Sequence, residues 1–249
     1  MGDQVSDGQE VCFCGRPVQK EKEMILIALN KPAGIVCTAE KREKNNVIDF
    51  LHYPKRIYPV GRLDKESEGL LLLTNNGEIV NKIMRSGNMH EKEYLVTVNR
   101  PVTDAFLHGM ANGVPLVELG TTTRKCRVER TGKKQFRIIL TQGLNRQIRR
   151  MCRALDYHVM NLKRVRIMNI QLGTLKRGEY RELTEKELSD LMKLVEGSTN
   201  LPAREAAKVG KLTDPAKRER KTVNSGYQGK KNDRRSFDKD NNRKSFEKK

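Results

Sequence analysis

An aspartate between two basic residues is the feature of this sequence best suited to chemistry. Asp64 lies in the run 61–69, with Arg62 and Lys65 beside it, and the apolar residues 70–73 follow. A glycine-bounded polar run before an apolar run is typical of a turn at the mouth of a buried strand. A carboxylate that neighbouring cations keep ionised is a usable covalent catalyst. The alternative is a turn aspartate whose side chain only accepts hydrogen bonds from its own backbone.

Two other segments carry polar side chains that a purely structural role does not require. Tyr94 follows Lys92 where alternating apolar residues begin, and residues 143–152 hold several arginines in a helical pattern. A tyrosine in a strand most often packs half-buried, and an arginine-rich helix most often faces solvent or phosphate. Each segment taken alone therefore leaves its function open.

Apolar patterning predicts the elements that would position these segments. Continuous or alternating apolar residues predict strands at residues 24–29, 35–38, 70–74, 91–98, 125–130 and 135–141, with a further strand near residues 165–170. Helical spacing predicts helices at residues 78–85 and 145–155, and a capping box of Thr184 and Glu187 predicts a last helix through Val195. Because strands dominate and the helices are scattered among them, we expect an α+β fold with a mainly antiparallel sheet.

The composition favours a nucleic-acid partner. The chain has 249 residues, and its 50 lysines and arginines against 31 acidic residues give a net charge of +19. Such an excess of positive charge indicates a polyanionic partner, and nucleic acid is favoured over an anionic membrane surface. No run approaches the roughly 18 apolar residues that span a bilayer, and the N-terminus lacks the pattern of a secretory signal. We therefore expect no membrane association.

The cysteines and histidines argue against disulfides and metal sites. The five cysteines are odd in number and scattered, which predicts a reducing compartment and a cytoplasmic location. Cys12 and Cys14 are one residue apart, the wrong spacing for a zinc knuckle, and the four histidines are equally dispersed. The sequence also lacks a glycine-rich phosphate loop. It therefore predicts neither a metal nor a small-molecule cofactor.

The three polar segments, in this order, resemble the motifs of the pseudouridine synthases, and within them of the RsuA/RluB/RluE/RluF group. The catalytic motif of that family looks like residues 61–74, its second motif like residues 92–96 and its third like residues 143–151. The resemblance covers about residues 24–195. It implies the pseudouridine synthase catalytic fold, in which helices flank the sheet and the active-site cleft lies beside the central strands.

Residues 81–94 and 166–169 are most similar to the RluF branch of this group. The resemblance implies that the chain acts on large-subunit ribosomal RNA, and that branch sometimes also acts on transfer RNA. It also implies that no metal or cofactor is needed. RNA contacts account for the charged surface without self-association, so we expect a monomer.

By position, the resemblance implies that Asp64 is the catalytic aspartate, that Tyr94 stacks on the target base and that Arg149 pairs with Asp64. Leu162 looks like the apolar residue that closes the other side of the base pocket. Basic residues around the flipped nucleotide would bind phosphates, and two further residues are predicted substrate contacts. This substrate-binding set is Arg62, Lys65, Lys92, Asn145, Arg146, Arg150 and Lys163.

The chemistry suits these residue types. Uridine becomes its C-glycoside when the bond from ribose to N1 breaks, the uracil turns and the ring rejoins through C5. A carboxylate can serve by attacking the ribose or the uracil ring, or by abstracting a ribose proton. The base must leave its stack first, because neither the sugar nor C5 is accessible inside a helix.

By sequence the chain divides into three parts. Residues 1–23 are predicted to be the end of an S4-like RNA-binding domain or a linker, residues 24–197 the catalytic domain and residues 198–249 a basic disordered tail. Members of this group usually begin with an S4-type domain of about sixty residues. Residues 5–18 look like the last strands of such a domain.

The leading hypothesis is an RNA pseudouridine synthase that isomerises a uridine in structured RNA, with 23S ribosomal RNA as the first candidate and transfer RNA as the second. One alternative is a catalytically silent RNA-binding ribosome-assembly factor, which accounts for the charge and leaves Asp64, Tyr94 and Arg149 without a role. Another is a hydrolase with an aspartate nucleophile, which also needs a dedicated water-activating base.

Overall fold

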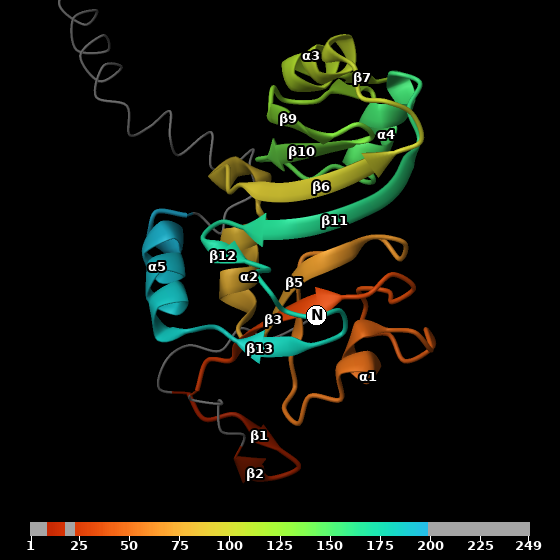
Figure 1. The fold of residues 1–249 in the computed structure, drawn as a ribbon. Coiled ribbons are helices and arrows are strands. Elements are labelled where there is room, and N and C mark those ends of the chain that lie inside the picture. The colour runs from red at the N-terminus through yellow and green to blue at the C-terminus, as the bar shows by residue number, and fades with distance from the viewer. Residues whose placement is uncertain (1–8, 18–22, 199–249) are drawn as a thin grey trace, which may run out of the picture. The chain divides into compact units, whose positions relative to one another are not determined.

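A nine-stranded sheet carries most of the fold (Figure 1). The structure is a computed structural model, and it describes residues 9–17 and 23–198. The strands lie in the order β13-β3-β5-β11-β6-β10-β9, with β12 paired to β11 and β4 paired to β5. Their bounds are β3 Leu26–Lys31, β4 Tyr58–Val60, β5 Glu68–Thr74, β6 Lys92–Val98, β9 Arg127–Gly132, β10 Gln135–Leu140, β11 Val159–Ile167, β12 Ile170–Gln171 and β13 Tyr180–Glu182.

Helices and two short hairpins complete the described residues. The helices are α1 Val47–Leu51, α2 Gly77–Met84, α3 Asp104–Asn112, α4 Gln147–Ala154 and α5 Glu185–Glu196, with 3-10 turns at Ser86–Asn88 and Val117–Leu119. One hairpin pairs β1 Cys12–Phe13 with β2 Arg16–Pro17, and the other pairs β7 Pro115–Leu116 with β8 Thr121–Thr122.

The sheet is mainly antiparallel. Within the described residues its one parallel pairing joins β5 to β11, where Lys163 lies opposite Glu68 and Arg164 opposite Gly69. The other ladders, including β3 with β5 and β6 with β11, are antiparallel. The predicted α+β class with a mainly antiparallel sheet is therefore confirmed. The parallel pairing joins the halves of the sheet that carry the polar segments.

Helices α3 and α4 pack on one end of the sheet. Phe106 and Met110 of α3 and Ile148 and Met151 of α4 form one core with the apolar side chains of β6 and β10. All four side chains are buried, with at most 4% of their surface exposed. This packing fixes the start of α4 beside β6 and β11.

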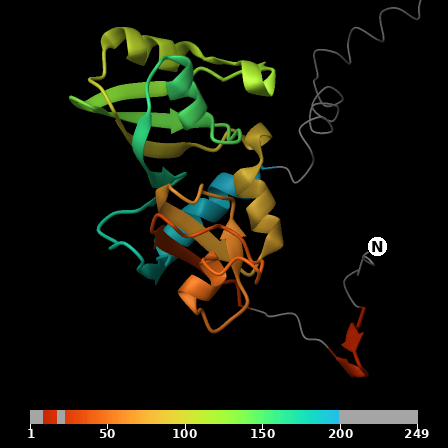
Figure 2. The same ribbon diagram turned by 90° about the vertical axis from the view of Figure 1, so that its right-hand side faces the viewer.

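Strands β3 and β5 are buried on both faces. Ile83 of α2 and Leu191 of α5 pack with Leu70 and Leu72 on one face, where Figure 2 shows the two helices next to each other. Leu71 packs on the other face with the residues of α1. Both faces of such a strand are buried, so its successive side chains are all apolar and do not alternate with polar ones. This explains the continuous apolar run after Asp64.

Most predicted elements are present with boundaries shifted by one to three residues, as for the strand predicted at 125–130 and found at Arg127–Gly132. The strand predicted at 35–38 is wrong. This segment makes a single bridge, between Val36 and Asn46. Asn46 is the N-cap of α1 and accepts a hydrogen bond from Asp49, so the chain turns into a helix where a second strand would have continued the ladder.

The capping box of α5 gives a stability prediction. The Thr184 side chain accepts a hydrogen bond from the Glu187 backbone, and the Glu187 side chain accepts one from the Thr184 backbone. Because Thr184→Ala leaves one amide of the first turn without a partner, we expect it to lower the free energy of unfolding by about 1 kcal/mol. Urea denaturation should show this loss. Ser189→Ala, at an exposed position of the same helix, should change stability by less than about 0.5 kcal/mol.

The predicted three-part division remains a prediction. In the first part the described residues form the β1–β2 hairpin, and the predicted disordered tail lies outside the described residues from residue 199 onward. None of the described helices combines the length and the apolar character that crossing a membrane requires.

Candidate active site

A tight turn presents Asp64 at the start of β5. The Ser67 amide donates to the Asp64 carbonyl at 3.0 Å, and the Leu63 amide donates to Cys37 Sγ at 3.3 Å. Leu63 and Ser67 are buried on either side, whereas 28% of the Asp64 side chain is exposed. The turn is therefore anchored at both ends, and it leaves the carboxylate accessible.

Helix α4 brings two arginines to this carboxylate. Arg149 Nε and Arg146 Nη1 each lie 3.6 Å from Asp64 Oδ2. Arg149 is mostly buried, and it donates to Ser67 Oγ at 3.3 Å and to the Val159 carbonyl at 3.4 Å. These contacts hold the Arg149 guanidinium in place against the Asp64 carboxylate.

Arg146 is shared between two carboxylates at the rim. It has a left-handed backbone conformation, with φ of +49°, immediately before the first turn of α4. Its Nη1 donates to Glu66 at 3.1 Å, and this hydrogen bond lowers the pKa of the Glu66 carboxyl. The same guanidinium faces Asp64, so α4 begins with a cation that bridges both acids of the turn.

A cavity of about 640 Å³ opens beside Asp64. Its walls come from the turn, the first residues of β6, the middle of β11 and the start of α4. The predicted site residues that line it are Arg62, Asp64, Lys65, Lys92, Tyr94, Asn145, Arg146 and Leu162. Segments that are far apart in the sequence thus meet at one cleft beside the central strands.

Tyr94 and Leu162 give the cavity its apolar surfaces. Tyr94 lies opposite Arg164 in the antiparallel ladder of β6 and β11, and Leu162 lies opposite Val96. Residues paired in this way place their side chains on the same face of a sheet. Tyr94 is half-buried and Leu162 is 6% exposed, and both add apolar surface to the wall of the cavity.

Comparison with known proteins identifies the family. The family model for "RNA pseudouridylate synthase" matches residues 25–154. The "Dual-specificity RNA pseudouridine synthase RluF" of Salmonella typhi is 54% identical over 202 residues, which cover 80% of this chain and 69% of the relative. The chain belongs to the RNA pseudouridylate synthase family.

Other relatives support the same assignment. The "Ribosomal large subunit pseudouridine synthase B" of Bacillus subtilis is 33% identical over 206 residues, covering 80% of this chain and 84% of the relative. A solved structure described as "Crystal structure of pseudouridylate synthase" is 31% identical, with a TM-score of 0.65 over 76% of this chain and 83% of that chain. The chain is therefore an RNA pseudouridine synthase, an isomerase of the RsuA/RluB/RluF group.

The remaining predicted residues of this synthase do not line the cavity. Arg149 lies behind Asp64 and contacts it from there. Arg150 forms a salt bridge with Glu118 and donates through Nε and Nη2 to Asn145. Lys163 follows Leu162 in β11, and neighbouring residues of a strand face opposite sides of the sheet. Phosphate binding by Arg150 and Lys163 therefore remains a prediction.

Two residues of the synthase that the sequence interpretation did not select are buried next to its site. Lys31 is fully buried, and its Nζ donates to the carbonyls of Pro32 and Ile35 at 2.7 and 2.8 Å. Burial lowers the pKa of Lys31, while Cys37 and nearby carboxylates, including Asp64, act in the opposite direction. Arg164 is 1% exposed and lines the cavity.

The sequence contained a signal for Arg164. If Leu162 faces the cavity, then residue 164 of the same strand faces it too, because side chains alternate along a strand. This alternation selects Arg164 over its neighbour Lys163. The part of the chain that the structure describes has no group of three or more histidine, cysteine, aspartate or glutamate side chains placed to hold a metal ion.

Proposed function

We propose that this synthase converts a uridine of 23S ribosomal RNA to pseudouridine, and that transfer RNA is its second class of substrate. The observation that carries the proposal is the position of Asp64, which lines an open cavity while Arg149 contacts its carboxylate. This arrangement gives a flipped nucleotide access to the Asp64 carboxylate. The dual-specificity name of the relative at 54% identity supports two classes of RNA substrate.

The cavity accounts for both the cleavage of the C1′–N1 bond and the formation of the C1′–C5 bond. The bond from C1′ to N1 breaks, the uracil turns, and a bond forms from C1′ to C5 while C5 releases its hydrogen. Asp64 attacks the ribose or the uracil ring, or abstracts a ribose proton. In each case Tyr94 and Leu162 hold the detached ring by its faces, so it can turn without leaving.

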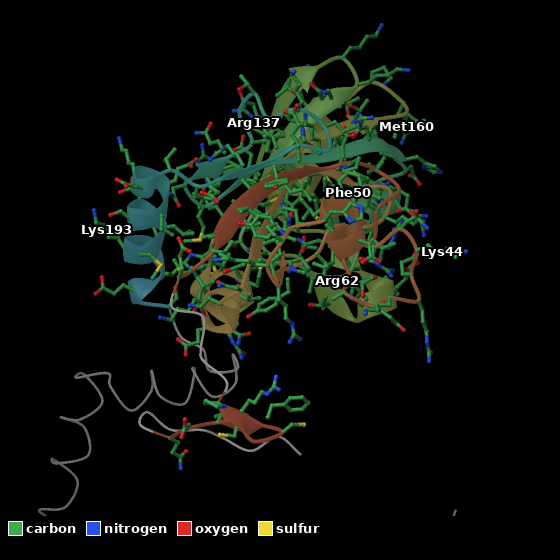
Figure 3. All side chains as sticks on the ribbon, turned by 90° about the horizontal axis from the view of Figure 1, so that it is seen from below. Lys44, Phe50, Arg62, Arg137, Met160 and Lys193 are labelled. Carbon is green, nitrogen blue, oxygen red and sulfur yellow. The ribbon has the colours of Figure 1, made fainter. Side chains whose placement is uncertain are left out.

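The charge of the chain suits an RNA that places one nucleotide in the cavity. Arg62 and Lys65 are exposed beside Asp64, where the sugar-phosphate chain of a flipped nucleotide would pass (Figure 3 labels Arg62). Contacts from such residues fix position and do not read sequence. The predictions of a cytoplasmic location and a monomer belong to this proposal.

Tritium release tests the substrate assignment. RNA transcripts of the large-subunit ribosomal RNA, the small-subunit ribosomal RNA and a set of transfer RNAs would carry tritium at C5 of uridine. We expect the wild-type protein to release tritium from the large-subunit transcript and from one or more transfer RNAs, and not from the small-subunit transcript. Release from the small-subunit transcript alone would contradict the proposal.

The proposed role of Tyr94 gives a graded prediction. Stacking contributes about 1–3 kcal/mol per base, so Tyr94→Ala should slow single-turnover pseudouridine formation by roughly 10- to 100-fold. Tyr94→Phe keeps the ring and should retain most of the wild-type rate. If the phenylalanine variant were as slow as the alanine variant, the hydroxyl group and not the ring face would be essential.

A further inference from the structure

Two buried cations lie side by side in the cavity. Lys92 of β6 is 4% exposed and Arg164 of β11 is 1% exposed, and both line the cavity with Tyr94. Lys92 Nζ donates to the His90 carbonyl at 3.2 Å. Arg164 Nε donates to the Leu70 carbonyl at 2.7 Å. The Arg164 Nη2 atom is buried and has no hydrogen-bond partner among the described residues.

Neither cation has a carboxylate partner in the part of the chain that the structure describes. The nearby Arg166 shows the contrast, because its guanidinium donates to Glu93 and Glu91, each at 2.8 Å. Burial of like charges without a counter-ion is costly. Burial and the charge of Arg164 lower the pKa of Lys92 to about 8. The two side chains are thus arranged for an anionic group that arrives with a ligand.

The position of the pair favours the base over the phosphates. Arg62, Lys65 and Arg146 are exposed cations at the rim, whereas the pair is buried next to the apolar side chains of Tyr94 and Leu162. The sugar-phosphate chain must enter and leave the site, so it passes along the rim. The part of a flipped nucleotide that extends deepest is the pyrimidine ring with O2 and O4.

The reaction makes that ring negative. When the C1′–N1 bond breaks, its electron pair stays on the uracil and spreads from N1 to O2 and O4. If a carboxylate instead adds to the ring first, the displaced electron pair also moves onto a ring oxygen. After the ring turns, C5 bonds to C1′ and loses its proton, and N1 gains a proton. Every proposed role of Asp64 thus passes through a ring that carries extra negative charge.

We propose that Lys92 and Arg164 bind the carbonyl oxygens of the flipped uracil and stabilise the negative charge that develops on the ring. This inference rests on the proposed function and adds two catalytic residues to it. Donors that are already in place and shielded from water stabilise such charge without reorganisation, and loss of one donor typically costs about 10²- to 10³-fold in rate. Cytosine carries an amino group in place of O4, so the same cations would disfavour it.

Matched substrates with different leaving groups test this inference. One RNA carries uridine at the target position, and the other carries 5-fluorouridine, whose fluorine withdraws electrons and stabilises the detached ring. The readout is the single-turnover loss of the target N-glycoside. We expect Lys92→Met to slow the reaction of the uridine substrate by about 10²-fold and that of the fluorinated substrate by only about 10-fold, because the fluorine already stabilises the negative charge on the detached ring. Arg164→Lys, which keeps the charge and moves it, should show the same trend.

A neighbouring arginine provides the control. Arg137 lies on β10, pairs with Glu93 and Glu129, and lies well away from Arg62 in Figure 3. Arg137→Gln removes one positive charge outside the cavity and should slow both substrates by less than about 3-fold. Equal losses for the two substrates in the Lys92 variant would overturn the inference. Failure of the wild-type protein on both substrates would contradict the proposed function instead.

The pH profile of the wild-type protein gives a second test, which does not require that a variant folds correctly. Burial and the charge of Arg164 lower the pKa of Lys92, the charge of Lys92 in turn lowers the pKa of His90 on the adjoining segment, and Asp64 lines the same cavity. Since loss of the proton removes the charge, the rate should fall as pH rises through about 8. Lys92→Arg should move this fall to higher pH. A rate that stays level from neutral pH through this range would contradict the inference.

Discussion

Replacement of Asp64 by asparagine should lower the single-turnover rate of pseudouridine formation by roughly 10³-fold or more. The amide occupies the same volume in the same turn, and it can act neither as a nucleophile nor as a base. RNA affinity should change by less than about 3-fold, because Arg62, Lys65 and the other rim cations remain in place. Release of tritium from C5 under single-turnover conditions measures the rate, and filter binding measures the affinity.

A second acid of the same turn is the matched control. Glu66 lines the same cavity and pairs with Arg146, as Asp64 does. Glu66→Gln removes the same charge from the same rim, and it should leave the rate within about 5-fold of wild type. If Asp64→Asn kept a tenth of the wild-type rate, or if both variants lost activity alike, the turn would contribute only charge.

The second large effect concerns stability. Gly69→Ala should lower the free energy of unfolding by about 4 kcal/mol, from backbone strain and overpacking together. Gly69 has φ of +102°, and a Cβ atom there would lie 2.2 Å from the Arg164 carbonyl oxygen. The Cβ atom would meet backbone atoms of Arg164, at the parallel pairing of β5 with β11, so no side chain can move aside to make room.

A glycine with a similar backbone separates the two causes. Gly34 has φ of +92°, is exposed, and has nothing within 4 Å of the position a Cβ atom would take. Gly34→Ala should therefore cost about 1 kcal/mol, from backbone strain alone. Urea denaturation of both variants gives the comparison. Equal losses would mean that the close approach of β5 and β11 contributes little.

Capping and apolar patterns in the sequence predicted the elements that interactions within one segment specify. The capping box at Thr184 and the alternating residues of β6 and β10 were sufficient to predict those elements. Helix α3 was missed although its signals are present, because the segment lies between two predicted strands. Thr103 caps it, and Phe106 and Met110 lie one helical turn apart on its buried side.

The pairing of the strands could not be predicted from local patterns. The parallel ladder of β5 with β11 joins residues about a hundred positions apart, and it is this ladder that brings Arg164 next to Gly69. The proximity of Asp64 and Arg149 was expected only from the resemblance to a family, because no pattern in either segment refers to the other. To predict Arg164 as a site residue, both the alternation of side chains along β11 and the burial of the inner end of the cavity had to be known.

The nucleoside composition of a 23S ribosomal RNA transcript after reaction with the wild-type protein tests whether the Asp64 cavity isomerises uridine in this RNA. We expect one pseudouridine at a single position, an equal amount of tritium released from C5, and no free uracil. Free uracil would indicate a hydrolase. Intact RNA with neither product, bound as tightly as before, would contradict the assignment of the Asp64 cavity as the site of isomerisation in this RNA.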